Sequence, residues 1–269
     1  MQRRELLRKG LVSATGIAAS SLFGCSSLIS ASKQEGKTAW GYIGQEGPEN
    51  WGSLSDEFNI CQAGNNQSPI NLQAAVDADL NPLEINYKDS PLRIINNGHT
   101  IQVNYQPGSF LTLDGEPYEL LQFHFHHPSE HKVEEEALPM ELHLVHKGDK
   151  GNLAVIGVFL KEGKSNPTLQ KVWKEMPNIK SSEKTISTVN ISASDLLPED
   201  QDYYRYFGSL TTPPCSETVS WIVLKEPVEI STQQVNKFSQ IFPMNARPVH
   251  FVKRRFLLDL IYFIMGIGL

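Results

Sequence analysis

Short runs of alternating or continuous apolar residues recur along the chain after about residue 38. The clearest are TIQVNY (100–105), FLTL (110–113), LAVIGVFL (153–160) and TVSWIVL (218–224). Gly, Pro, Asn and Asp, which favour turns, separate these runs. Because successive side chains of a strand point to opposite faces, the pattern predicts a mostly β domain.

One segment, residues 167–176, has helical spacing instead. Asn166 is suited to cap its first turn, and Pro167 fits the first helical position. The apolar side chains form one stripe that we expect to pack in the core: Leu169, Val172, Trp173 and Met176. No repeat or linker interrupts residues 38–252, so we expect a single α+β domain over this range.

Residues 1–24 have the pattern of an export signal. Basic residues at 3, 4, 8 and 9 precede the small, apolar run GLVSATGIAASSLFG. The stretch LFGC, ending at Cys25, resembles the lipobox of bacterial lipoproteins, in which the cysteine is acylated. Residues 25–37 then suit a polar tether to a membrane. A plain signal peptide cut elsewhere is the alternative, and the Arg3-Arg4 pair also permits twin-arginine export.

The tail, residues 253–269, becomes apolar from Phe256 onward. It is shorter than the roughly 20 residues that cross a bilayer, and Asp259 interrupts it. Its role stays open between docking on the domain, a disordered end, dimerisation and contact with a membrane surface.

The composition is that of an ordinary folded protein, with 40% hydrophobic and 20% charged residues among 269. The formal net charge is −6, and removal of residues 1–24, which hold four basic groups and Glu5, leaves −9. Such an acidic domain argues against nucleic acid as a partner.

The chain has three cysteines. If Cys25 is acylated, Cys61 and Cys215 remain in an oxidising compartment, periplasm or cell envelope, and we predict a disulfide between them. Two unpaired buried thiols are the alternative.

Histidines are concentrated in QFHFHHPSEH, residues 122–131, which holds four of the eight in the chain. In a strand, Gln122, His124 and His126 share one face. In a second strand, MELHLVH (140–146), Glu141 and His143 share a face in the same way. Pairing of the two strands would bring three imidazoles into one space.

Three neutral imidazoles with an open fourth position are typical of a catalytic zinc site. Ligand histidines normally donate their other N–H to an acceptor, and Gln122 and Glu141 lie two residues before His124 and His143. The three histidines that we interpret as structural or surface residues lie on the other face or beyond Pro128: His127, His131 and His146.

With these residues in place, the chain resembles the α class of carbonic anhydrases over residues 38–252. Eight motifs carry the resemblance in order: WGY (40–42), QSPINL (67–72), NNGH (96–99), QFHFH (122–126), SEH (129–131), ELHLVH (141–146), SLTTPPCSE (209–217) and WIVLKEP (221–227). The family's fold is a large twisted, mainly antiparallel sheet with short peripheral helices and a conical cleft that holds the zinc. The C-terminal tail departs from the family's usual end.

The resemblance implies reversible hydration of carbon dioxide to bicarbonate and a proton by zinc-bound hydroxide. Thr211 would accept a hydrogen bond from that hydroxide and donate one to Glu130, and His99 would be the proton shuttle. Further residues match family positions in groups: zinc ligands His124, His126 and His143 with their acceptors Gln122 and Glu141; a proton path of Tyr42, Asn97 and Gln102; and an apolar carbon dioxide pocket of Val145, Val155, Leu210 and Trp221. Cys61 and Cys215 match the disulfide of exported bacterial members, and the Ser68-Pro69 and Pro213-Pro214 bonds match cis positions.

Three other functions are alternatives to carbon dioxide hydration. His124, His126 and Glu130 also fit part of a cupin iron or manganese motif, but a second histidine motif is missing. A noncatalytic binding protein of this fold would be expected to lack a zinc histidine. A zinc-scavenging lipoprotein would need a long histidine- and acid-rich loop, of which HHPSEHKVEEE is a weak version.

Overall fold

A computed structural model describes residues 38–261. The predicted export signal, Cys25 and residues 262–269 lie outside the described residues. The helices among the described residues are α1 (Trp51–Leu54), α2 (Ile60–Ala63), α3 (Pro167–Glu175) and α4 (Thr232–Ser239), with 3-10 turns at Gly44–Glu46, Asp56–Phe58 and Ala193–Leu196. None of these helices is long and apolar enough to span a membrane.

The longest strands, of 9 to 11 residues, lie at the centre of the sheet. The strands among the described residues are β1 (Asn71–Leu72), β2 (Val76–Ala78), β3 (Glu84–Asn86), β4 (Ser90–Asn96), β5 (Ile101–Asn104), β6 (Phe110–Leu113), β7 (Glu116–His126), β8 (Lys132–Val133), β9 (Met140–Gly148), β10 (Leu153–Glu162), β11 (Lys184–Ile191), β12 (Tyr203–Gly208), β13 (Val219–Leu224), β14 (Val228–Ile230) and β15 (Leu258–Leu260).

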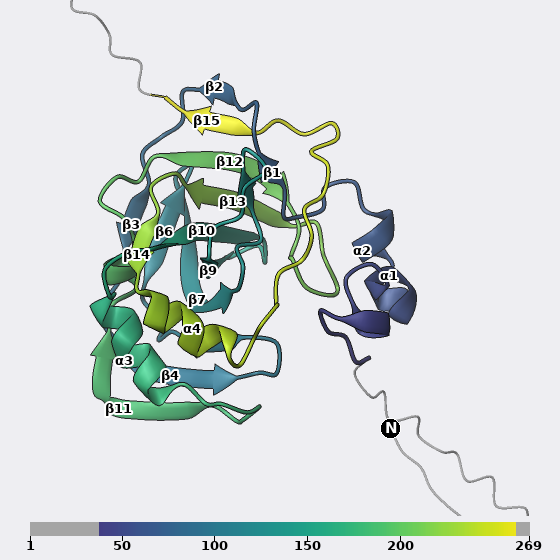
Figure 1. The fold of residues 1–269 in the computed structure, drawn as a ribbon. Helices are drawn as coiled ribbons and strands as arrows, with labels where there is room; N and C mark the ends of the chain where they lie inside the picture. Colours follow the sequence, from purple (N-terminus) through teal and green to yellow (C-terminus); the bar gives the residue numbers. More distant parts are fainter. Residues whose placement is uncertain (1–37, 262–269) are drawn as a thin grey trace, which may run out of the picture. The chain divides into compact units, whose positions relative to one another are not determined.

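One 13-stranded sheet organises the domain (Figure 1). Ten of its strands follow the order β11-β4-β5-β7-β9-β10-β13-β12-β15-β2, while β6 pairs with β7 and β3, and β14 pairs with β10. Pairing is antiparallel from β11 through β10, whereas β10 with β13 and β15 with β2 are parallel. Strand β10 is covered on both faces, which explains its continuous apolar run. The mostly β fold and mainly antiparallel sheet expected from the sequence are confirmed.

Alternate residues of the central strands contribute to two separate hydrophobic clusters. On one face, Phe125 of β7 contacts Trp173 of α3, with ring centroids 4.6 Å apart, and Trp173 stacks on Phe238 of α4 at 5.8 Å. On the other face, Val155 of β10 and Trp221 of β13 belong to the second cluster. The first cluster makes a rigid backing for the strands, and the second lies on the side of the histidines.

The predicted helix and the predicted cis peptide bonds are present in the structure. The predicted helix is α3, and Oδ1 of Asn166 accepts a hydrogen bond from the amide of Leu169 at 3.0 Å. The bonds Ser68-Pro69 and Pro213-Pro214 are cis, and so is His127-Pro128. In the tail, β15 pairs with β12 and β2, so residues 258–260 are part of the sheet.

Candidate metal centre

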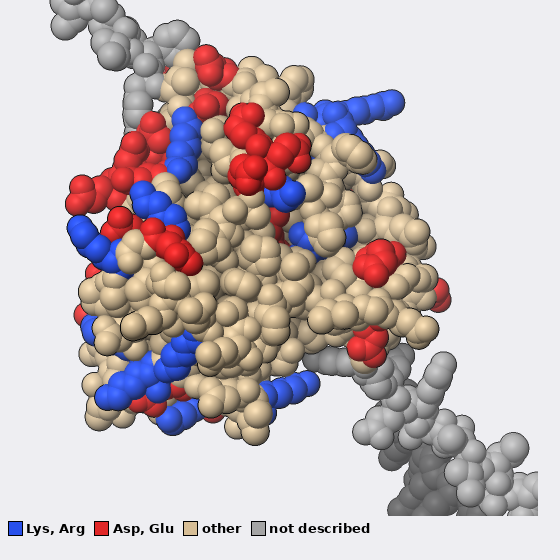
Figure 2. All heavy atoms as spheres, in the orientation of Figure 1, with Lys and Arg blue, Asp and Glu red and all other residues tan. Residues whose placement is uncertain are grey.

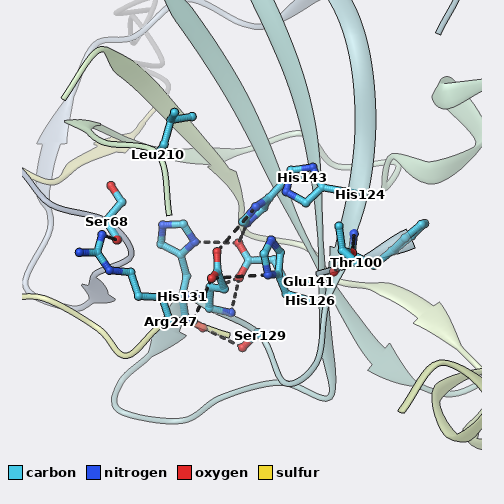
Figure 3. A network of polar contacts seen from close by, with 12 residues as sticks. Ser68, Thr100, His124, His126, Ser129, His131, Glu141, His143, Leu210 and Arg247 are labelled. Carbon is cyan, nitrogen blue, oxygen red and sulfur yellow. Dashed lines mark hydrogen bonds and ion pairs between the residues drawn. The ribbon is translucent and has the colours of Figure 1, made fainter. Parts of the chain in front are cut away.

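The register between β7 and β9 brings the three candidate ligand histidines together. His124 lies directly opposite His143, and His126 lies opposite Glu141. The ring centroids of His124, His126 and His143 are 4.5 to 5.3 Å apart, and Figure 3 shows the rings converging. Phe123 and Phe125 point into the core on the opposite face, as the period of a strand requires.

Each ring uses one nitrogen for a hydrogen bond within the protein and leaves the other free. Nδ1 of His124 donates to Oε1 of Gln122 at 2.9 Å, and Nδ1 of His126 donates to the carbonyl of Asn245 at 2.7 Å. Nε2 of His143 donates to Oε1 of Glu141 at 2.9 Å. One nitrogen from each of the three rings lies within 4.8 Å of the other two. This arrangement of neutral imidazoles fits a zinc ion with an open position.

The free Nε2 of His126 is the clearest sign that a ligand belongs here. It is buried and has no hydrogen-bond partner among the described residues. A buried polar atom without a partner costs free energy, about 1–3 kcal/mol, unless something occupies the site. Burial, followed by the neighbouring imidazoles, holds the pKa of His124 well below its usual value, and burial also lowers the pKa of His126. Both rings are therefore neutral at pH 7, the form that binds a metal.

Glu141 connects the ligand His143 to the residues behind it. Its Oε1 accepts from His143 and from Nδ1 of His131, and its Oε2 accepts from the amides of Glu130 and His131. Burial alone would raise the pKa of Glu141, but the electrostatic attraction and the hydrogen bonds of the His131 and His143 rings outweigh it and hold this pKa well below its usual value. The carboxylate therefore stays ionised and fixes the His143 ring.

Glu130 lies against the ligand rings. Its Oε1 is 3.5 Å from Nδ1 of His126, and its Oε2 is 3.9 Å from Nδ1 of His143. Oε1 also accepts from the amide of Arg247 at 2.9 Å, whereas Oε2 is buried without a hydrogen-bond partner in the described part of the chain. Thr211, its expected donor, is buried in the loop between β12 and β13, and no hydrogen bond joins it to Glu130 in this structure.

A small polar cavity opens beside the histidines, with a volume of about 130 Å³. It contains the expected shuttle His99 together with Tyr42, Asn97 and Gln102, and its remaining lining is Trp40, Thr100, Gln122, His124, His126 and Thr212. Trp40 stacks on the His99 ring with centroids 3.7 Å apart. Burial, and secondarily Lys180, lowers the pKa of His99.

The expected carbon dioxide pocket coincides with the second hydrophobic cluster. Val155 and Trp221 are buried in it, and Val145 and Leu210 pack against it. The Trp221 ring lies 4.8 Å from the ring of His143. The metal centre therefore has an apolar border formed by these residues and a separate polar cavity that contains His99.

The disulfide between Cys61 and Cys215 is present. It joins the segment around α2 to the loop that carries Thr211, because Cys215 follows Thr211 by four residues. Nε2 of Gln67 donates to the carbonyl of Cys215 and reinforces this connection.

Two buried residues of the site, Asn245 and Arg247, were not predicted from the sequence. Asn245 supplies the carbonyl for His126 and an amide that donates to the carbonyl of His99. Arg247 contacts Glu130 through its backbone amide.

His131, which was predicted to be a structural or surface residue, is a buried structural residue that bonds Glu141 and the Tyr206 hydroxyl. His146 is also buried, against Tyr87, whereas the ring of His127 bonds the carbonyl of Pro243.

Comparison with known proteins agrees with this geometry. The profile of the eukaryotic-type carbonic anhydrase family matches residues 46–255. The chain belongs to this family. It is 47% identical over 266 residues to a carbonic anhydrase of Nostoc sp., covering 97% of this chain and 98% of that protein. It is 45% identical over 212 residues to one from Pectobacterium carotovorum, covering 78% and 86% of the two chains.

A solved carbonic anhydrase structure shows the same fold. The α-carbonic anhydrase of Thermovibrio ammonificans, in complex with the inhibitor sulfanilamide, superposes with a TM-score of 0.80 at 48% identity. The match covers 83% of this chain and 100% of that chain. The whole of that solved chain is therefore matched by part of this one.

Proposed function

We propose that this protein catalyses the reversible hydration of carbon dioxide to bicarbonate and a proton, with zinc held by His124, His126 and His143. The observation that carries the proposal is the convergence of three imidazole nitrogens whose partner nitrogens are all occupied by protein acceptors. When bound, zinc lowers the pKa of a water ligand to about 7, the value known for carbonic anhydrases, and so supplies hydroxide at neutral pH.

Glu130 and Thr211 are proposed to orient the attacking hydroxide. Oε2 of Glu130 is buried and still lacks a donor, which the Thr211 hydroxyl is suited to supply. A hydroxyl that donates its only proton to a carboxylate can only accept on its other side. Thr211 would then accept a hydrogen bond from the hydroxide, which leaves an oxygen lone pair directed at the substrate.

His99 is proposed to carry the released proton from the site to buffer. Its lowered pKa keeps the imidazole neutral near pH 7, so that it can accept a proton. Tyr42, Asn97 and Gln102 line the same cavity, and Nδ2 of Asn97 donates to Oε1 of Gln102 at 3.3 Å. These polar groups are suited to order the water chain that such a transfer needs.

The apolar border of the site is proposed to hold carbon dioxide. Carbon dioxide is small and nonpolar, so it needs apolar contact more than hydrogen bonds. The four side chains of this pocket are Val145, Val155, Leu210 and Trp221. The Trp221 indole N–H donates to the carbonyl of Ser209, so its polar atom is directed into the protein and not into the pocket.

Export and membrane anchoring are proposed alongside the activity. The disulfide is typical of an oxidising compartment, and the relatives named above include bacterial proteins. Cleavage before Cys25, its acylation and a tether over residues 25–37 would place the domain in the periplasm or cell envelope. Membrane fractionation of cells that express the full chain tests the anchor. On membranes washed with high salt, which removes proteins held by charge alone, Cys25→Ser should be released while the parent protein stays bound, and equal retention of both would contradict acylation at Cys25.

The activity is tested by stopped-flow hydration of carbon dioxide by residues 26–269, before and after zinc removal. Hydration should be lost with the metal, return when zinc is added and be abolished in His143→Ala. His127→Ala is the matched control and should leave hydration unchanged, because among residues 38–261 the His127 ring bonds the carbonyl of Pro243 and no group of the metal centre. Thr211→Val should lower kcat/KM by about 100-fold, while Thr211→Ser retains most of the rate. No hydration by fully zinc-loaded protein would overturn the proposal.

A further inference from the structure

The loop that leads into β15 exposes large aromatic side chains. Phe251 is 86% exposed and Phe256 is 72% exposed, and Phe207 at the end of β12 is 49% exposed. Side chains of this kind are usually buried, so several on one segment indicate a surface that contacts something else. None of these phenylalanines belongs to the metal centre or its cavity.

The same loop is basic, in the sequence HFVKRRF (250–256). Arg255 is fixed in place: Nη2 donates to the carbonyl of Gln67 at 2.8 Å, and Nη1 to that of Phe207 at 3.1 Å. Arg254 makes no hydrogen bond or ion pair with the described residues. Within the described part of the chain, the ammonium of Lys253 donates hydrogen bonds to neutral oxygens, of Gly64 and Asn65, and to no carboxylate. The positive charges of Lys253 and Arg254 are therefore not neutralised there and can attract an external anion.

This basic loop contrasts with the rest of the domain. Residues 1–37 hold six basic and two acidic groups and residues 262–269 hold none, so residues 38–261 carry a formal net charge of −10. Between Glu229 and Asp259 the chain contains no acidic residue. Figure 2 shows basic side chains projecting at the upper right, over the loop that precedes β15 in Figure 1.

Hollows on both sides of Arg254 shape this surface. One, of about 580 Å³, is lined by Asn65, Asn66, Lys253 and Arg254. The other, of about 470 Å³, includes Phe207, Arg254 and Phe256 in its lining. Cationic and aromatic side chains thus lie together on one loop beside two hollows.

We propose that the segment 251–256, together with Phe207, docks on the surface of an anionic lipid bilayer. Aromatic rings are stable at the boundary between headgroups and acyl chains, and lysine and arginine bind anionic headgroups at about the same depth. Because the domain is otherwise acidic, an anionic membrane attracts this loop and repels the remaining surface. The docking is separate from acylation of Cys25 and needs no lipid on the protein.

Other occupants fit the surface less well. A symmetric contact between two copies would bring Lys253 and Arg254 close to their own counterparts and repel. The apolar residues 262–269 of this chain contain no acidic side chain that could neutralise the two cations. An anionic bilayer satisfies both the phenylalanines and the cations.

Flotation of residues 38–269 with vesicles tests the proposal without any acyl group. The two hydrophobic clusters described above, and a third formed by Trp51, Phe58 and the two disulfide cysteines, all lie within residues 38–261, so this piece retains them. Vesicles of phosphatidylcholine mixed with phosphatidylglycerol should bind the protein, and phosphatidylcholine alone should not. Lys253→Glu with Arg254→Glu should weaken binding by at least about tenfold. The control, Lys161→Glu with Lys164→Glu, makes the same change in net charge at exposed positions elsewhere and should weaken binding much less than the loop pair does.

The aromatic contribution is tested in the same assay. Phe251→Ser with Phe256→Ser should also weaken binding, whereas Ile43→Ser with Ile179→Ser, at positions 76% and 78% exposed, should not. Phe251→Trp should be quenched by brominated lipid and Ile179→Trp should not. Equal loss in the loop and control variants, or no binding of the unsubstituted domain to phosphatidylglycerol vesicles, overturns the proposal. Loss of a dimer in the phenylalanine variant, without any vesicle binding, would assign the surface to a second copy.

Discussion

Oε1 of Glu130 accepts a 2.9 Å hydrogen bond from the backbone amide of Arg247, 117 residues later in the chain. The guanidinium of the same arginine is buried and donates to the carbonyls of Ser68 and Cys61, each at 2.8 Å. Burial lowers the pKa of Arg247 to about 10, which still leaves it charged at neutral pH. One residue therefore links Glu130 to the segment that carries the disulfide.

Arg247→Lys should destabilise the protein and slow hydration. An ammonium cannot reproduce the planar fork that reaches two carbonyls, so at least one buried acceptor is left without a donor, at a cost of about 1–3 kcal/mol. Urea unfolding measures this loss, and Arg93→Lys, in an exposed pair with Glu183, should cost less than about 1 kcal/mol.

Hydration kinetics distinguish positioning from stability alone. In folded Arg247→Lys, kcat/KM should fall while zinc affinity is unchanged, because Glu130 moves and the three ligands do not. Unchanged kinetics in the folded variant would restrict Arg247 to a structural role.

Glu141→Gln should weaken zinc binding by about 10- to 100-fold. Both carboxylate oxygens accept two donors each, so an amide would place its own N–H groups against at least one of those pairs. Competition with a chromophoric chelator measures the affinity. Glu136→Gln, at an exposed position, is the control and should bind zinc normally. Equal affinity in the two variants would contradict a role for Glu141 in holding His143.

The zinc ligands could be predicted from sequence because strand geometry is local. A period of two is enough to place His124, His126 and their acceptor Gln122 on one face, and the same rule applies to Glu141 and His143. Their pairing across β7 and β9 then follows if the two strands are neighbours, as they are.

The partners that complete the site depend on contacts between distant segments, which no local pattern encodes. Asn245 reaches His126 across 119 residues, and MNARPV has no periodicity that marks it. The structural role of His131 likewise depends on Tyr206, 75 residues away. Thr211, Glu130 and His99 were identified through resemblance alone, because in isolation each resembles an ordinary turn or surface residue.

Lys180→Met should shift the pH dependence of proton transfer. Lys180 packs over Gly98, where a Cβ would lie 3.2 Å from its Cδ, and its charge contributes to the lowered pKa of the adjacent His99. Removing the charge raises that pKa toward its ordinary value of about 6.5, so the imidazole keeps its proton to a higher pH. The acid limb of kcat in weak buffer should therefore move to higher pH.

The buffer dependence provides the control for this variant. At high buffer concentration, where external buffer accepts the proton, Lys180→Met and the parent protein should hydrate carbon dioxide at the same rate. His99→Ala should show no shift on adding Lys180→Met, and added imidazole should partly restore its rate. A shift of the acid limb to lower pH would contradict the electrostatic assignment.

Replacing both Cys61 and Cys215 with serine should lower the free energy of unfolding by about 2–5 kcal/mol. The disulfide closes a long loop, with a sequence separation of 154 residues, so its loss restores much entropy to the unfolded chain. It also holds the loop of Thr211 against the segment bonded to Arg247, so kcat should fall in the folded variant as well. Urea unfolding and stopped-flow hydration measure the two effects, and Cys25→Ser should change neither. Equal stability of the oxidised and reduced parent protein would show that packing of the segment around Trp51, and not the covalent bond, holds the loop in place.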